Sequence, residues 1–218
     1  MPGKKKSQRK PPKQRKRMPE EARRRQLVAA ASTVACRDGI AGLTLRAVAA
    51  EAQVSHGLVL FHFRRKALLV RALLEWLIES NSMLDLSEDI ARFPRAMDQL
   101  HALLQQEMAR FSRRPEHTRL FLEFWALGAQ HEGIRARIGA EIQRYRTAFR
   151  TIMEKLLSAE PTAFGSVSAE GLSSVVVSWI HGCAIQAMAD PENFDSDEYL
   201  AAVRGVIWSS ARLGATGA

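Results

Sequence analysis

Residues 44–66 contain the feature that most constrains the fold, namely two short helical segments separated by a corner of three or four residues. Thr44 can cap a helix over 45–52, and Ser55 can cap a second helix that follows the corner. Val48 and Ala49 share the inward face of the first segment. Two short capped helices joined in this way form a helix-turn-helix unit.

The rest of the chain also has helical periodicity. A first helix can begin at Pro19 and stop near Gly39, and Lys66 opens a longer helix. Further apolar helical stretches cover 93–112, 116–128, 132–158, 168–190 and 196–213. Because alternating strand patterns are absent, the sequence predicts an all-α protein of about nine helices.

The charge of the tail and the extent of the helix-turn-helix pattern divide the chain into three parts, which we take as domains. Residues 1–17 hold nine Lys and Arg residues and no acid, which predicts a disordered tail suited to a polyanion. Residues 18–65 form the predicted helix-turn-helix domain. Residues 66–218 form the helical domain that remains, with the helix from Lys66 connecting the two. The alternative for the tail is a solvated extension, absent if translation starts at Met18.

Cysteine usage and hydropathy favour a cytoplasmic protein. Cys36 and Cys183 are distant in sequence, and neither belongs to a CxxC pair. No run of about 18 uncharged apolar residues is present to span a bilayer, and the N-terminus lacks a secretory apolar segment. We therefore expect no membrane association.

The segment TLRAVAAEAQVSHGLVLFHFRRKALL resembles the DNA-binding signature of the TetR family of bacterial transcriptional regulators. The matching positions are Thr44, Ala49, Val54, Ser55, Gly57, Val59, Phe63 and Lys66. The resemblance covers about residues 20–80. More loosely, residues 121–157 resemble the C-terminal domain of the choline-responsive repressors. Two positions depart from the family: Gln53 replaces the usual corner glycine, and Leu60 replaces a tyrosine.

The resemblance implies a recognition helix that packs through Val59 and Phe63 and presents its other face to the major groove. It implies base contacts for Arg46 and His56 and phosphate contacts for Lys66 and His62. Leu58 and Leu60 suit a thymine methyl group, and Gly57 permits close approach. The predicted DNA-binding residues are Thr44, Arg46, Ser55, His56, Gly57, Leu58, Leu60, Phe61, His62 and Lys66, with Lys13, Arg15, Lys16 and Arg17 from the tail.

The function expected from this resemblance is a homodimeric repressor that binds a palindromic operator in double-stranded DNA and is released by a small-molecule effector. The alternative is a small helical enzyme or ligand carrier whose basic N-terminus is only a solvated extension. No Walker loop, HExxH, G-x-S-x-G or G-x-G-x-x-G pattern supports an enzyme. The scattered set His101, Glu107, His117 and Glu123 is more typical of core or surface residues than of a metal site, so we expect no metal or cofactor.

Two further sets follow from the resemblance. The effector set is Phe121, Phe124, Trp125, Tyr145, Met153, Trp179 and Met188, and Trp125, Tyr145 and Trp179 could cage a quaternary ammonium group. The dimer set, on the last two helices, is Trp179, Ala184, Ala187, Ala201, Ala202 and Trp208. The alternative for both sets is packing within one subunit.

Overall fold

The computed structural model describes residues 18–81, 88–159, 161, 164 and 166–215, and in these residues all regular structure is helical. The helices are α1 (Glu20–Gly42), α2 (Leu45–Glu51), α3 (His56–His62), α4 (Lys66–Asn81), α5 (Glu88–Ala91), α6 (Ala96–Arg113), α7 (Pro115–Gly128), α8 (Glu132–Ala159), α9 (Ala169–Ala189) and α10 (Ser196–Ala215). The all-α prediction is confirmed. The additional helix is α5, a single turn that carries too few residues to show a period.

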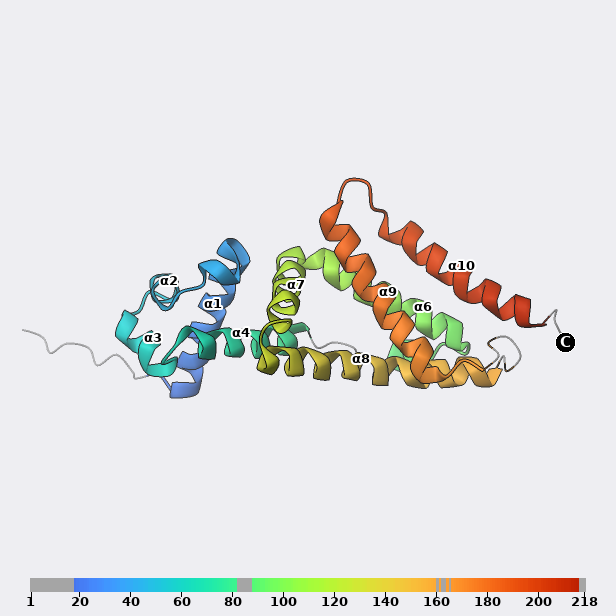
Figure 1. The fold of residues 1–218 in the computed structure, drawn as a ribbon, viewed down its shortest axis with the longest axis horizontal. Helices are drawn as coiled ribbons and strands as arrows, with labels where there is room; N and C mark the ends of the chain where they lie inside the picture. The colour runs from blue at the N-terminus through green and yellow to red at the C-terminus, as the bar shows by residue number, and fades with distance from the viewer. Residues whose placement is uncertain (1–17, 82–87, 160, 162–163, 165, 216–218) are drawn as a thin grey trace, which may run out of the picture.

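Helices α1 to α4 occupy one end of the elongated molecule, and α6, α8, α9 and α10 occupy the other (Figure 1). The first end has a continuous apolar core in which Val34, Val59 and Leu73 are fully buried. Leu120 and Phe124 of α7 belong to the same core. Helix α7 therefore packs against the helix-turn-helix end.

A second core fills the other end of the molecule. It includes Leu103 of α6, Phe149 and Ile152 of α8, and Ile180 of α9, all of which are 0% exposed. Leu200 of α10 closes it from the outside. Helix α9 runs obliquely to α8 and meets its C-terminal half (Figure 1), where the two helices pack together.

The length and apolar composition of α9 contradict the expectation that no segment could span a bilayer. By length and composition alone it is apolar enough to do so, the only such helix within the described residues. Here Val176, Val177 and Ile180 face the second core. Core helices of water-soluble proteins meet the same compositional criterion, so the finding is weak evidence for a membrane.

Candidate DNA-binding surface and ligand cavity

Both predicted caps of the helix-turn-helix unit are present. The Thr44 hydroxyl accepts a hydrogen bond from the Ala47 N–H at 3.0 Å, and the Ser55 hydroxyl accepts one from the Leu58 N–H at 3.3 Å. The bond to Ala47 satisfies an N–H of the first helical turn, and the Leu58 N–H is shared between the Ser55 hydroxyl and the Ser55 carbonyl, which lies at 3.0 Å. The caps therefore fix where α2 and α3 begin.

The corner between α2 and α3 has the strain expected from its sequence. Gln53 has φ 54°, the only positive φ among the described non-glycine residues. The left-handed region is disfavoured for a side chain with a Cβ. The following N–H, that of Val54, donates to the Ala49 carbonyl at 2.9 Å and holds the corner closed.

Helix α3 is anchored by the two residues predicted for that role. Val59 is 0% exposed and Phe63 is 1% exposed. The guanidinium of Arg24 lies over the Phe63 ring, 5.2 Å from its centre. Because α3 has only seven residues, this packing, rather than helix propensity, holds it in place.

The opposite face of α3 is open to solvent and unusually apolar. Phe61 is 72% exposed and Leu60 is 44% exposed, and the Phe61 ring meets His62 edge to face. His56 and Gly57 are also exposed. A Cβ added to Gly57 would meet no described atom within 4 Å. Leu58 is half-buried, so its side chain is less available than that of Leu60.

Exposed cations flank this face. Arg46 of α2 and Lys66 at the start of α4 are both exposed. The Lys66 ammonium donates to the Ala41 carbonyl at 3.1 Å and so joins α4 to the end of α1. The predicted tail contacts Lys13, Arg15, Lys16 and Arg17 lie outside the described residues.

A link between α1 and α7 was not foreseen. The Glu123 carboxylate accepts a hydrogen bond from the Ile40 N–H at 2.7 Å, directly after the break in α1 where Gly39 has φ 70°. The Arg119 guanidinium donates to the Cys36 carbonyl nearby. Because Glu123 and Ile40 are 83 residues apart, no local pattern could have revealed their contact.

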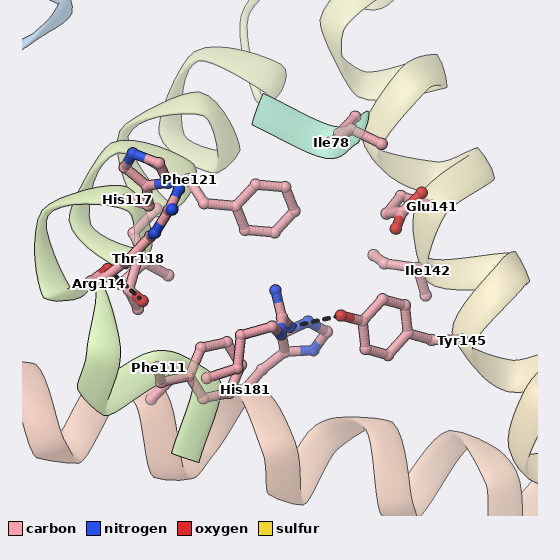
Figure 2. Close-up of a pocket in the computed structure, with 13 residues that line it drawn as sticks. Ile78, Phe111, Arg114, His117, Thr118, Phe121, Glu141, Ile142, Tyr145 and His181 are labelled. Atoms are coloured by element: carbon pink, nitrogen blue, oxygen red, sulfur yellow. Dashed lines mark hydrogen bonds between the residues drawn. The ribbon is translucent and has the colours of Figure 1, made fainter. Parts of the chain in front are cut away.

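A cavity that is partly open to solvent lies between helices α4, α6, α7, α8 and α9. Phe121 of α7 faces Glu141 and Ile142 of α8 across it, and Tyr145 and His181 lie at its base (Figure 2). Ile78 of α4 contributes to the wall. The cavity therefore connects through α4 and α7 to the helix-turn-helix end.

Three polar side chains form a buried cluster at the base of the cavity. Nη2 of Arg110 donates to Glu107 at 2.5 Å and to the Tyr145 hydroxyl at 2.6 Å, and that hydroxyl donates to Glu107 at 3.1 Å. Glu107 is fully buried. Burial, with the Glu107 charge second, raises the pKa of Tyr145 well above its usual value, so the phenol stays protonated as a donor.

Glu141 is a second buried acid, and it lines the cavity wall directly. It is 6% exposed, and its Oε1 accepts from Arg144 at 3.0 Å. Its Oε2 is buried and has no hydrogen-bond partner within the described residues. Burial raises the pKa of Glu141, while the nearby charges of Arg144, Arg137 and Arg110 act in the opposite direction.

The two histidines of the cavity are held neutral. Burial and then the Arg110 charge lower the pKa of His181 to about 4. Burial and then the Arg114 charge lower the pKa of His117, which lies beside Trp76. Nδ1 of His117 has no partner among the described atoms. At neutral pH the histidines therefore add polarity to the wall but no charge.

The predicted effector residues are only partly brought together. Phe121 and Tyr145 line the cavity, and Trp125 lies behind it with its ring 4.7 Å from that of His181. The remaining four lie elsewhere: Phe124 and Met153 are core residues, Trp179 packs on the second core, and Met188 is 41% exposed beside a separate cavity. Trp125, Tyr145 and Trp179 therefore do not form the expected cage on this cavity.

The predicted dimer residues are also divided. Ala201 and Ala202 of α10 are exposed, as are Val206 at 55% and Ile185 of α9 at 43%. Ala184 differs from the prediction, because it is 4% exposed and faces the cavity of its own subunit. Trp179 and Ala187 are half-buried, and the side chain of Trp208 lies outside the described part.

The described residues contain no group of three or more His, Cys, Asp and Glu side chains that could hold a metal ion. Of the set considered from the sequence, Glu107 is bound to Arg110 and Tyr145, and Glu123 is bound to Ile40. His117 is a cavity residue. These side chains therefore have separate structural roles.

Comparison with known protein families gives a match for each end of the chain. Residues 27–73 match the model of the bacterial regulatory proteins of the tetR family. Residues 96–209, more than half of the chain, match the C-terminal domain of BetI-type transcriptional repressors. A curated relative from Xanthobacter autotrophicus, an uncharacterised HTH-type regulator encoded in the dhlA 5' region, is 27% identical over 163 residues, which are 73% of this chain and 76% of the relative.

Solved structures share the fold. A candidate transcriptional regulator from Pseudomonas aeruginosa has a TM-score of 0.72 at 22% identity, covering 90% of this chain and 95% of its own. One from Saccharomonospora viridis, solved with choline, has a TM-score of 0.73 at 15% identity, covering 87% and 97%. The regulator FadR of Bacillus subtilis, solved with stearoyl-CoA, has a TM-score of 0.62 at 15% identity, covering 89% and 98%. From the helix-turn-helix geometry and these matches, the chain belongs to the TetR family and is a DNA-binding transcriptional regulator with a BetI-type C-terminal domain.

Proposed function

We propose that this regulator is a homodimeric repressor that binds a two-fold symmetric operator through α3 and leaves it when a small molecule occupies the cavity. The observation that carries the proposal is the division of α3, with Val59 buried and Leu60 and Phe61 exposed beside cations. A buried helix has no need of such a face. A major-groove reader requires one.

Within this proposal the exposed residues divide into two groups. Arg46 and His56 contact base edges, and Leu60 and Phe61 contact thymine methyl groups in the major groove. Lys66 and His62 contact phosphates, which position the domain without reading sequence. Thr44 and Ser55 place the N-termini of α2 and α3 toward the backbone, where helix ends attract phosphate.

Dimerisation follows from the surface of the last two helices. Ile185 of α9 and Val206, Ala201 and Ala202 of α10 leave apolar area exposed on these helices. A two-fold pairing of these helices would cover that area. It would also place two α3 helices on half-sites about 34 to 36 Å apart.

The basic tail, residues 1–17, strengthens binding to DNA of any sequence. Residues 18–65 recognise the operator, and residues 66–218 bind the ligand and form the dimer. We place the protein in the cytoplasm. The relatives solved with choline and with stearoyl-CoA support a ligand-binding role for the C-terminal domain. A ligand shifts the equilibrium between the DNA-binding and the released conformation only to the extent that it binds the released conformation more tightly.

Selection from random duplex DNA tests the function. We expect enrichment of a two-fold symmetric site, and gel filtration of the complex should give two subunits per site. An asymmetric enriched site would refute the symmetric dimer. If no sequence is enriched, the repressor proposal fails and the alternative of an enzyme or ligand carrier with a solvated basic extension gains support.

A further inference from the structure

The cavity wall contains one buried acid whose hydrogen bonding is incomplete. Glu141 lines the cavity, is 6% exposed, and has no hydrogen-bond partner at Oε2 within the described residues. A buried carboxylate oxygen without a partner is costly, because burial removes the water that would otherwise bind it. Figure 2 shows Glu141 on the α8 wall, opposite Phe121.

The positive charges around the cavity are either paired within the protein or screened by solvent, so the Glu141 carboxylate is the charged group that a ligand can use. Arg110 is bound to Glu107 at 2.5 Å and to Tyr145 at 2.6 Å, so its charge is balanced inside the protein. The partner of Glu141, Arg144, is 50% exposed, and solvent screens its charge. Arg114 is exposed at the rim and is screened in the same way.

The remaining wall is aromatic and uncharged. The rings of Phe121, Tyr145 and His181 line it, together with apolar side chains such as Ile78 and Ile142. Ring faces attract cations, and apolar side chains favour a ligand with a hydrocarbon body. The neutral histidines do not repel a cation.

The Oε2 atom of Glu141, which has no described hydrogen-bond partner, would discriminate between classes of cation. An ammonium group that retains N–H bonds can donate to Oε2 of Glu141 and form a charge-assisted hydrogen bond. A quaternary ammonium has no N–H, so it would leave this oxygen without a donor. The aromatic cage that would compensate is not assembled, because Trp179 does not line the cavity.

We propose that the cavity binds a protonated primary or secondary amine with a compact apolar body, whose N–H group donates to Oε2 of Glu141. The inference rests on the proposed function only in treating this cavity as the effector site. It makes Glu141 the residue that determines ligand class, and Phe121 and Tyr145 the aromatic surfaces beside the cation.

Calorimetry on the full-length protein at pH 7.5 tests the inference with four probes: hexylamine, 2-phenylethylamine, hexyltrimethylammonium and hexanoic acid. At this pH both amines are protonated, since alkyl ammonium groups lose their proton near pH 10. We expect at least one amine to bind, and to bind about tenfold or more tightly than the quaternary and carboxylate probes.

Two variants separate the role of Glu141 from general effects of charge. Glu141→Gln keeps the shape of the side chain and removes its charge, and it should weaken amine binding by about tenfold or more. Glu154→Gln is the matched control, because Glu154 lies on the same helix but is 58% exposed and forms a surface ion pair with Arg150. It should bind amines like the unmodified protein. Melting curves of both variants verify folding.

Three results would overturn the proposal. They are no binding of either amine, binding of hexyltrimethylammonium as tightly as hexylamine, and equal amine affinity in the Glu141→Gln variant. Release from a selected operator, followed by fluorescence anisotropy with hexylamine, is measured separately. A protein that binds amines but enriches no DNA refutes the repressor function alone, whereas one that binds DNA and ignores amines refutes only the ligand class.

Discussion

The contact between Glu123 of α7 and the Ile40 N–H of α1 provides the sharpest test of how the two ends are joined. The bond is 2.7 Å long and follows the left-handed turn at Gly39. A hydrogen bond to a charged acceptor contributes about 1.5 to 3 kcal/mol, and Glu123 is only half-buried, so we take about 2 kcal/mol. Glu123→Leu removes the acceptor and leaves the Ile40 N–H without a partner.

The expected consequence is a lower melting temperature. For a chain of this length, 1 kcal/mol corresponds to roughly 2 to 4 °C, so Glu123→Leu should melt about 4 to 8 °C lower than the unmodified protein. Glu123→Gln retains an acceptor oxygen and should lose about half as much. Thermal unfolding followed by far-UV circular dichroism measures both, with Glu154→Gln as a surface control.

A Glu123→Leu protein that melts within about 1 °C of the unmodified protein would refute this reasoning. So would a Glu123→Gln protein that loses as much as Glu123→Leu, because the effect would then come from charge rather than from the hydrogen bond. The cooperativity of the transition adds a second measure, since loss of the link should broaden it if the two ends unfold more independently.

Three other predictions concern recognition and pH. Lys66→Ala should weaken binding to all DNA sequences alike and lower the salt slope by about one, as measured by anisotropy titrations; an effect confined to one base position would contradict the phosphate role. Arg46→Ala should relax preference at one base position by about 1 to 3 kcal/mol, and an unchanged selected site would exclude base readout. The pKa of His181, lowered to about 4 in the folded protein, makes the unfolded chain bind more protons, so stability should fall as pH drops from about 6.5 toward 4, by up to about 3 kcal/mol. Urea unfolding at pH 7.5 and 5 should show about 2 kcal/mol of this loss, and His181→Phe should remove it.

The sequence predicts the helix-turn-helix unit well because its determinants are local. Thr44 and Ser55 lie three residues before the N–H groups that they cap. Val59 and Phe63 are four residues apart and therefore share one helical face. Even the strained corner at Gln53 could be expected, since the resemblance to the TetR family implies glycine at that corner.

The cavity could not be predicted with the same accuracy. Its residues come from five helices, and the contact between Tyr145 and Glu107 spans 38 residues. Periodicity shows that Phe121, Phe124 and Trp125 belong to one apolar stretch, but not which of them face a cavity rather than the core. The acid at Glu141 was missed because a charged residue on a long helix normally indicates a solvated face. No local signal distinguishes it from Glu154.

Gly57 carries a consequence for attempts to improve this regulator. A glycine in a helix costs about 1 kcal/mol relative to alanine, and a methyl group here would meet no described atom within 4 Å. Folding alone would therefore favour alanine at this position. In the proposed function, glycine at this position lets a DNA backbone approach the start of α3 closely. We expect a search for thermostable variants to select a change at Gly57 and, if α3 contacts DNA as proposed, to lower the affinity for the operator.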